Sequence, residues 1–233
     1  MERLQRIRQS ERESHIHAYS HYQLYEDGSW LKKPVQTVLD TLKLFESYSS
    51  LRVLDLGCGV GRNSIAVANY FSDTPCRVDC VDILPLAIQK LTEYGDKYQV
   101  SNSICGYISP IDSFYIEENT YDLVLAVSVL EHSDSEESLI KMFVKIKNGI
   151  RSEGIFCLIM NTDVHEYDPK TGMEVPAQFE VNLTEEMLRD HLKQMFCGWQ
   201  ILKDTSKMQR YDISRDKTVS YLHTTVVTYV VKK

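Results

Sequence analysis

The sequence predicts an α/β fold in which a doubly wound, mostly parallel sheet is covered by helices on both faces. Two observations lead to this fold class. Strand-like apolar runs alternate with segments whose apolar residues recur at helical spacing. The strand-like runs are also apolar throughout instead of alternating with polar residues, which is typical of parallel strands that are buried on both faces.

Strands and helices alternate through the first two thirds of the chain. The expected strands are short apolar runs at residues 52–57, 76–83, 103–108, 121–130 and 155–160. After the first strand, Ile65, Ala68 and Phe71 share one face of a helix, and Pro85 fits the first turn of the helix after the second strand.

Another helix is expected between the last two of these strands. Leu139, Phe143 and Ile146 form its apolar stripe, and Ser133 followed by Glu136 is typical of a helix N-terminus. Residues 151–154 (RSEG) then predict a turn into the next strand.

The last third of the chain is expected to begin as a loop and to end in strands. Residues 161–176 are rich in charge and turn-forming residues, which predicts the loop. Thr184 is the expected N-cap of a helix whose first turn is acidic. Residues 198–204 and 221–231 follow as two strands with no helix between them, which indicates an antiparallel pair at the sheet edge.

Composition limits the function classes. The net charge of −7 disfavours a nucleic-acid partner, because phosphate contacts need clustered Lys and Arg. No segment approaches the roughly 20 apolar residues of a membrane span. The first residues also lack a secretion signal, so we expect a cytoplasmic protein without a membrane partner. The six cysteines form no CxxC motif, so we expect neither a metal site nor a disulfide framework.

The glycine-rich stretch VLDLGCGVGRNS carries the main functional signal. Gly57, Gly59 and Gly61 have the spacing G-x-G-x-G, whereas the dinucleotide fingerprint G-x-G-x-x-G places its third glycine inside the helix. Asp55 lies at the end of the first strand, where it can hold a cationic ligand group or brace the turn. Asp82 ends the second strand, where a carboxylate can accept hydrogen bonds from both ribose hydroxyls. Together these positions predict a ligand with a ribose and a cationic amine but no pyrophosphate.

With DLGCGVG as a first motif and VDCVDI as a second, the chain resembles the class I S-adenosylmethionine-dependent methyltransferases over roughly residues 51–160. The resemblance implies a Rossmann-like, seven-stranded sheet whose last strand is antiparallel. It also implies S-adenosyl-L-methionine as the cofactor. The cofactor-binding residues that it implies are Asp55, Gly57, Cys58, Gly59, Gly61, Asn63, Asp82, Ile83, Ile108 and Val127.

We expect one domain, because 233 residues that are 43% hydrophobic suffice for a single core. Residues 1–45 would form an N-terminal helical cap, and residues 51–160 would form the cofactor-binding core. Residues 161–233 would supply a substrate loop and the C-terminal strands. The sequence predicts no oligomeric state.

Candidate catalytic residues follow the fourth strand. The family often places substrate-facing residues there, so Glu131 and His132 are candidates at the carboxyl ends of the strands. Alternatively, His132 caps or packs the entry of a helix and Glu131 braces the cofactor loop. Tyr19 and Trp30 belong to an aromatic stretch before the first strand, which could either pack as an ordinary helix or screen a sulfonium by cation–π contact.

A narrower resemblance is to the tellurite-resistance branch of small-molecule methyltransferases. GVGRNS and the later segment VPAQFEVNLTEEMLRDHLKQMFCGWQILK resemble that branch, whose substrates are small, soft anions. Arg210 matches its substrate-side arginine and is our third catalytic candidate, whereas Gln209 stands where the branch carries a histidine. This departure leaves proton transfer at that position open.

The expected function is methyl transfer from S-adenosylmethionine to a small-molecule acceptor by in-line displacement. Such an enzyme mainly has to align the acceptor with the carbon–sulfur bond. Two alternatives stay open at this point: a non-catalytic S-adenosylmethionine-binding partner or sensor protein, and an NAD-dependent oxidoreductase, which the glycine spacing disfavours.

Overall fold

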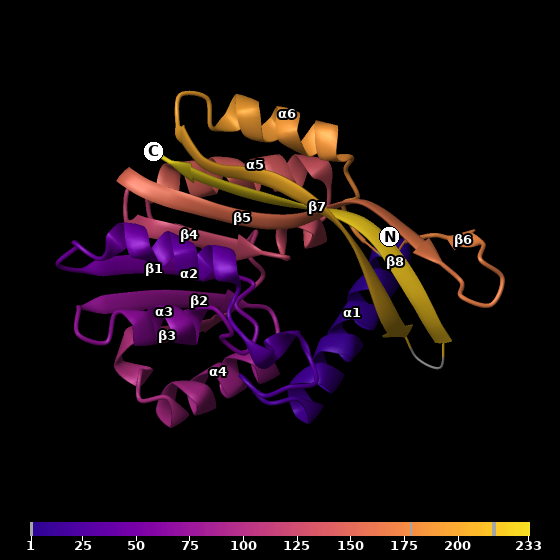
Figure 1. Cartoon of the computed structure of the whole chain (residues 1–233), viewed down its shortest axis with the longest axis horizontal. Coiled ribbons are helices and arrows are strands. Elements are labelled where there is room, and N and C mark those ends of the chain that lie inside the picture. Colours follow the sequence, from indigo (N-terminus) through magenta and orange to yellow (C-terminus); the bar gives the residue numbers. More distant parts are fainter. Residues whose placement is uncertain (1, 178, 216–217) are drawn as a thin grey trace.

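The protein is described here from a computed structural model that covers residues 2–177, 179–215 and 218–233. One eight-stranded sheet has the order β3-β2-β1-β4-β5-β8-β7, and β6 pairs with β5 outside this path (Figure 1). Its strands are β1 (Leu51–Leu56), β2 (Cys76–Asp82), β3 (Ile104–Ile108), β4 (Tyr121–Val127), β5 (Ile150–Tyr167), β6 (Glu174–Val175), β7 (Gln200–Arg215) and β8 (Thr218–Lys232).

The sheet is parallel from β3 to β5 and becomes antiparallel at its C-terminal edge. β8 pairs antiparallel with β5, and β7 pairs antiparallel with β8. All seven residues of β4 are buried, as expected for a central parallel strand that is covered on both faces. The predicted α/β fold with an antiparallel last strand is therefore confirmed.

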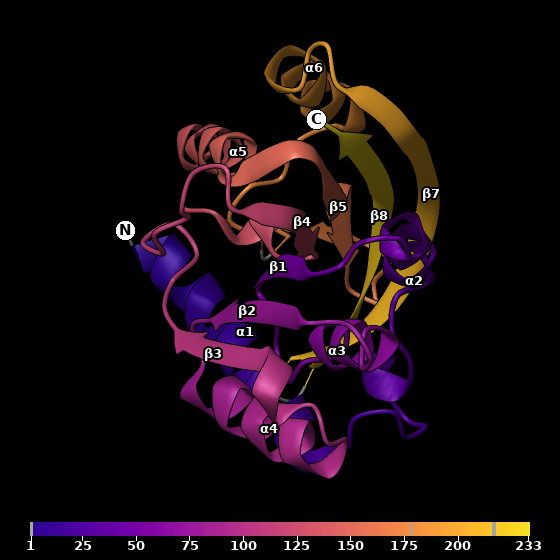
Figure 2. The ribbon, with the colours of Figure 1, turned by 90° about the vertical axis from the view of Figure 1, so that its left-hand side faces the viewer.

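Helices cover both faces of this sheet (Figure 2). The helices are α1 (Glu2–His21), α2 (Gln36–Leu42), α3 (Ser64–Tyr70), α4 (Pro85–Lys97), α5 (Glu136–Gly149) and α6 (Glu185–Met195). One core cluster joins the sheet to α2, α3 and α4, and a second joins its other face to α5 and α6. The doubly wound arrangement follows from these two cores.

Helix starts follow the sequence signals at two of three sites. Pro85 stands in the first turn of α4, and the Thr184 hydroxyl accepts a hydrogen bond from the Met187 N–H at the start of α6. The prediction of Ser133 as the cap of α5 was wrong. Ser135 is the N-cap, because its hydroxyl accepts from the Ser138 N–H at 3.2 Å and the helix begins at Glu136.

The N-cap of α6 gives a stability prediction. Thr184→Ala leaves the Met187 N–H without its capping partner, so we expect it to lower the free energy of unfolding by about 1 kcal/mol. Chemical denaturation measures this change. Thr184→Ser keeps the hydroxyl and should stay close to wild type, and equal losses in both variants would contradict the capping argument.

Two segments that the sequence assigns to loops are strand instead. β5 begins at Ile150 and runs through the predicted turn at 151–154 and on to Tyr167, into the predicted loop. Residues 165–167 pair with residues 221–223 of β8, which are far away in the sequence. Nonlocal pairing therefore overrides the turn-like composition of both segments.

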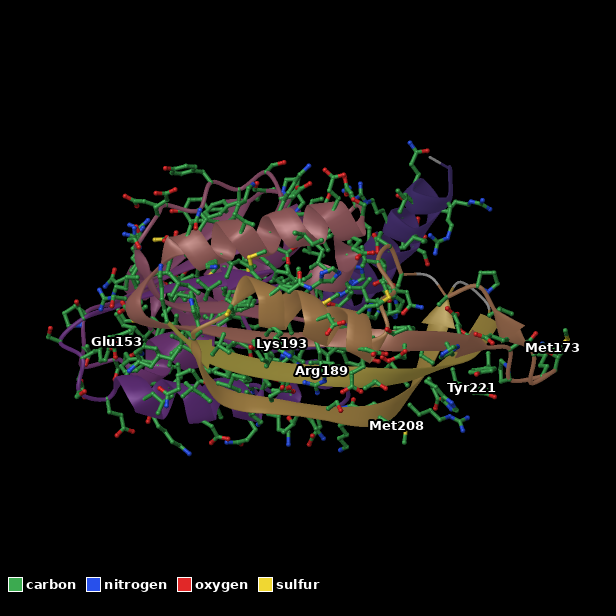
Figure 3. The ribbon with its side chains drawn as sticks, turned by 90° about the horizontal axis from the view of Figure 1, so that it is seen from above. Glu153, Met173, Arg189, Lys193, Met208 and Tyr221 are labelled. Atoms are coloured by element: carbon green, nitrogen blue, oxygen red, sulfur yellow. The ribbon has the colours of Figure 1, made fainter. Side chains whose placement is uncertain are left out.

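The C-terminal strands are much longer than predicted. β7 and β8 extend beyond the parallel core together with the end of β5 (Figure 1). Figure 3 shows this from above: Met173 and Tyr221 lie in the projecting part, far from Glu153 at the other end of the molecule. Within the part of the chain that the structure describes, no helix combines the length and the apolar character needed to span a membrane.

Helix α1 crosses the end of the sheet beneath this projection (Figure 1). It lies where the carboxyl ends of the parallel strands meet, because Tyr19 of α1 packs on the turn after β1. At the N-terminal end of α1, the Arg3 guanidinium donates to the carbonyl oxygens of Ala177 and Phe179, at 3.4 and 3.1 Å. α1 is thus fixed to the segment that precedes α6.

Candidate active site

The glycine turn between β1 and α3 has a backbone that only glycine adopts readily. Gly57, Gly59 and Gly61 all have positive φ, at 67°, 54° and 91°. A Cβ on Gly57 would lie 2.3 Å from a methyl carbon of Val129, and one on Gly61 would lie 2.4 Å from a methyl carbon of Leu91. Conformation and close packing therefore both require these glycines.

Asp82 closes the turn from the end of β2. Its Oδ2 accepts from the Gly59 N–H at 2.9 Å, and its Oδ1 accepts from the Leu84 N–H at 2.8 Å. Burial raises the pKa of Asp82, and these backbone donors partly offset the rise. Each carboxylate oxygen has a second acceptor site, so the group can still receive two ribose hydroxyls.

Asp55 lies beneath the turn, and its carboxylate is bound by another side chain of the protein. Its Oδ2 accepts from the Ser64 hydroxyl at 2.5 Å, which links the end of β1 to the start of α3. Burial raises the pKa of Asp55 to about 7. Of the two roles that the sequence leaves open for Asp55, this contact supports bracing of the turn.

The other predicted cofactor residues differ in how they are placed. Cys58 donates its N–H to the Val81 carbonyl at 3.0 Å, and Asn63 accepts from the Val35 N–H at 3.1 Å through its side chain. Cys58, Asn63 and Val127 are buried, whereas Ile83 and Ile108 are both 59% exposed. Ile83 directly follows β2 and Ile108 ends β3, so both lie at the same edge of the sheet as Asp82.

Helix α1 places an aromatic side chain directly on the glycine turn. The Tyr19 hydroxyl oxygen lies 2.8 Å from the position that a Cβ on Gly59 would take. Burial and the negative charge of Asp82 raise the pKa of Tyr19 well above its ordinary value. The His15 ring contacts the rings of both Tyr19 and Trp30, at centroid distances of 5.6 and 6.1 Å. The aromatic stretch noted in the sequence thus lies over the turn that would hold the cofactor.

Glu131 follows β4 and is completely buried. Its Oε1 accepts from the side-chain amide of Asn161 at 2.6 Å and from the Asn161 N–H at 3.2 Å. Its Oε2 is buried without a hydrogen-bond partner among the described residues. Asn161 belongs to the part of β5 beyond the predicted strand, and no sequence motif marks it.

His132 is held by a carboxylate from the segment before α6. Its Nδ1 donates to Oε2 of Glu180 at 2.9 Å, and its ring stacks on Phe179. Burial alone would lower the pKa of His132, but the Glu180 hydrogen bond and the charge of Glu131 outweigh it and raise this pKa to about 9. Arg8 of α1 contacts Glu180 at 3.8 Å and also pairs with Asp134.

Arg210 is not brought together with the other two catalytic candidates. Its guanidinium lies over the Tyr221 ring, 4.1 Å from the centroid, in the projecting part of the hairpin (Figure 3). Neighbouring residues of a strand point to opposite faces, so the side chains of Arg210 and Tyr211 lie on opposite faces of β7. Burial and the negative charge of Glu131 raise the pKa of Tyr211, and its hydroxyl donates to the Gln209 side chain.

Comparison with known proteins agrees with the motifs in the core. Residues 54–156 match a family model described as a methyltransferase domain. The sterol 24-C-methyltransferase of Saccharomyces cerevisiae is 24% identical over 159 residues, which cover 64% of this chain and 39% of the relative. The chain thus spans about two fifths of the length of that curated relative.

Solved structures share the fold. TehB from Haemophilus influenzae has a TM-score of 0.64 at 22% identity, and the match covers 85% of this chain and 62% of TehB. A geranyl diphosphate methyltransferase, solved in complex with S-adenosylmethionine, has a TM-score of 0.56 at 11% identity over 84% of each chain. At these identities, both likenesses show that the fold is shared.

The matched domain contains the glycine turn and Asp82, and the strand order places both at the carboxyl edge of a sheet that these structures share. Residues 54–156 of this chain thus match a methyltransferase domain, and the chain shares the fold of TehB.

Proposed function

We propose that the protein transfers the methyl group of S-adenosylmethionine to a small-molecule acceptor. The observation that carries this proposal is the closed turn in which Asp82 holds the Gly59 N–H and keeps acceptor sites for a ribose. The turn also lacks the helix glycine that a pyrophosphate ligand requires, since Arg62 and Asn63 stand there. The residues present therefore fit the family's cofactor.

The roles of the chain's regions follow from the contacts. Residues 51–160 would hold the cofactor, and α1 would cover it through Tyr19. The segment before α6, together with β7, would line the acceptor side through Glu180 and Tyr211. When bound, S-adenosylmethionine supplies a sulfonium methyl that is already activated for attack by a nucleophile.

The protein's own contribution is alignment, exclusion of water and proton transfer. Holding the acceptor in line can supply roughly 7–11 kcal/mol of the barrier reduction in favourable cases. Because Glu180 holds Nδ1 of His132, Nε2 is the ring nitrogen left to accept a proton from the acceptor. Because the pKa of His132 is about 9, the fraction of His132 that is neutral and able to accept a proton increases as the pH rises toward 9.

Calorimetric titration with S-adenosylhomocysteine tests the cofactor site. Asp82→Asn removes the charge and one of the two backbone acceptors, so we expect affinity to fall roughly 10- to 100-fold, as for the loss of a hydrogen bond to a charged group. Asp73→Asn removes the same charge at an exposed position and should leave affinity unchanged. Equal affinities for all three proteins would contradict the proposed site.

Activity is tested separately by following the demethylated product over a panel of small acceptors. Product formation that depends on both acceptor and enzyme supports the proposal. If the protein binds S-adenosylhomocysteine but turns over no acceptor in the panel, a non-catalytic binding role takes its place. If it binds NAD and not S-adenosylhomocysteine, both the methyltransferase and the binding role fail.

A further inference from the structure

Glu131 carries a carboxylate oxygen for which the described residues offer no partner. The side chain is completely buried, and Asn161 donates twice to Oε1. Oε2 is buried, and no described residue donates to it. Burying such an atom without a hydrogen bond is costly, so a donor is expected to complete the site.

The surroundings of Glu131 place that donor on the acceptor side of the protein. Asn161 comes from β5, Tyr211 comes from β7, and the Val181 N–H donates to the Glu131 carbonyl oxygen at 3.0 Å from the segment before α6. The glycine turn and Asp82 lie instead at the ends of β1 and β2. The group that reaches Oε2 would therefore belong to the acceptor.

The charges around Glu131 favour a cationic group. The cations that the structure places here are His132 and Arg8, and both contact Glu180. Arg8 also pairs with Asp134, so these two cations already face two carboxylates. Arg210, the residue that would hold an oxyanion, stacks on Tyr221 instead. The charge of the buried Glu131 carboxylate helps to raise the pKa of His132, but no described cation forms an ion pair with this carboxylate.

We propose that the methyl acceptor is an amine, which binds as its ammonium form and donates a hydrogen bond to Oε2 of Glu131. The nitrogen then gives one proton to Nε2 of His132, and its freed lone pair takes the methyl group as the carbon–sulfur bond breaks, which leaves S-adenosylhomocysteine and the methylated amine. The inference rests on the proposed function and names the substrate class of that same site. It differs from the anionic substrates implied by the resemblance to the tellurite-resistance branch. A positive amine would satisfy the buried oxygen and balance its charge at the same time.

Glu131→Gln separates a ligand-binding role from a structural one. The amide keeps an oxygen for the two Asn161 donors and removes the charge that lacks a counterion. Because the unfilled site is costly, we expect the variant to unfold at the same or a higher temperature than wild type. A clear loss of stability would mean that the carboxylate serves the fold, and would overturn the proposal.

The direct test uses the full chain saturated with S-adenosylhomocysteine and three probes with one carbon skeleton: butylammonium, butanol and butyrate. The Asn161 side-chain amide, followed by NMR, reports on the Glu131 carboxylate that it contacts. We expect butylammonium to shift this signal with at least about tenfold higher affinity than butanol, because its hydrogen bond is charge-assisted. Butyrate should not bind. Glu131→Gln should remove the preference for butylammonium.

A matched control is Glu174→Gln, which changes an exposed glutamate in β6 and should leave probe binding unchanged. The proposal is overturned if butyrate binds more tightly than butylammonium, or if butylammonium does not shift the Asn161 signal. It is overturned equally if Glu131→Gln does not lower the affinity for butylammonium. It is also overturned if Glu131→Gln weakens the binding of S-adenosylhomocysteine, since Oε2 of Glu131 would then contact the cofactor. A wild-type chain that binds no S-adenosylhomocysteine overturns the proposed function instead.

Discussion

Gly57→Ala is expected to lower the free energy of unfolding by roughly 2–5 kcal/mol and to abolish tight cofactor binding. Positive φ costs a residue with a Cβ about 1–2 kcal/mol. At Gly57 the new methyl group would also lie 2.3 Å from Val129, and overpacking of this kind typically costs a further 1–3 kcal/mol. A shift of the turn that relieves this clash would move the Gly59 N–H away from Asp82.

Gly172→Ala is the matched control. Gly172 has almost the same φ, 68°, but a Cβ there would meet nothing within 4 Å. It should therefore show only the conformational cost of about 1–2 kcal/mol and unchanged binding of S-adenosylhomocysteine. Chemical denaturation and calorimetry measure both quantities, and equal losses in the two variants would show that packing against Val129 contributes nothing.

The glycine turn and the position of Asp82, which form the proposed cofactor half of the site, could be predicted because their signals are local in the sequence. Gly57, Gly59 and Gly61 lie within one turn, and positive φ restricts each position to glycine. Asp82 ends the neighbouring parallel strand, so the topology alone brings it to the same edge. Continuous apolar runs likewise identified β1, β2, β4 and the inner part of β5.

The projecting strands could not be predicted, because their stability comes from pairing between distant residues. Residues 165–167 carry polar and turn-like side chains, and only their ladder with residues 221–223 makes them strand. Strand preference depends strongly on such context. The same long pairing places Tyr211 in β7 opposite Leu222, and the charge of Glu131 adds to the burial that raises the pKa of Tyr211.

Only some residues of the proposed acceptor half of the site could be predicted from the sequence. Glu131 and His132 could be named because they follow a confident strand at the functional edge of the sheet. Glu180 comes from a segment without periodicity, and its contact with His132 spans 48 positions of the chain. Arg210 and Tyr211 are adjacent, yet they point to opposite faces of β7, so sequence position alone does not decide which one faces the site.

The contact between His132 and Glu180 predicts how stability and activity depend on pH. The pKa of His132 is raised from 6.5 to about 9, so the stabilising contact is fully present below about pH 6.5 and is lost as the pH rises through about 9. Its contribution to the free energy of unfolding is on the order of 3 kcal/mol, at about 1.36 kcal/mol for each pKa unit. If His132 accepts a proton from the acceptor, the rate should rise over the same interval.

Glu180→Gln removes the charge that holds the imidazolium, so the pKa of His132 falls even though the charge of Glu131 still opposes the effect of burial. We expect the inflection in both the NMR titration of His132 and the rate profile to move to lower pH by the same amount. Glu136→Gln is the matched control, since it changes an equivalent contact with His191 at 2.7 Å between α5 and α6. It should leave the rate profile unchanged. A rate profile that ignores Glu180→Gln while the NMR titration moves would show that His132 takes no part in proton transfer, because only a base that touches the acceptor couples its own pKa to the rate.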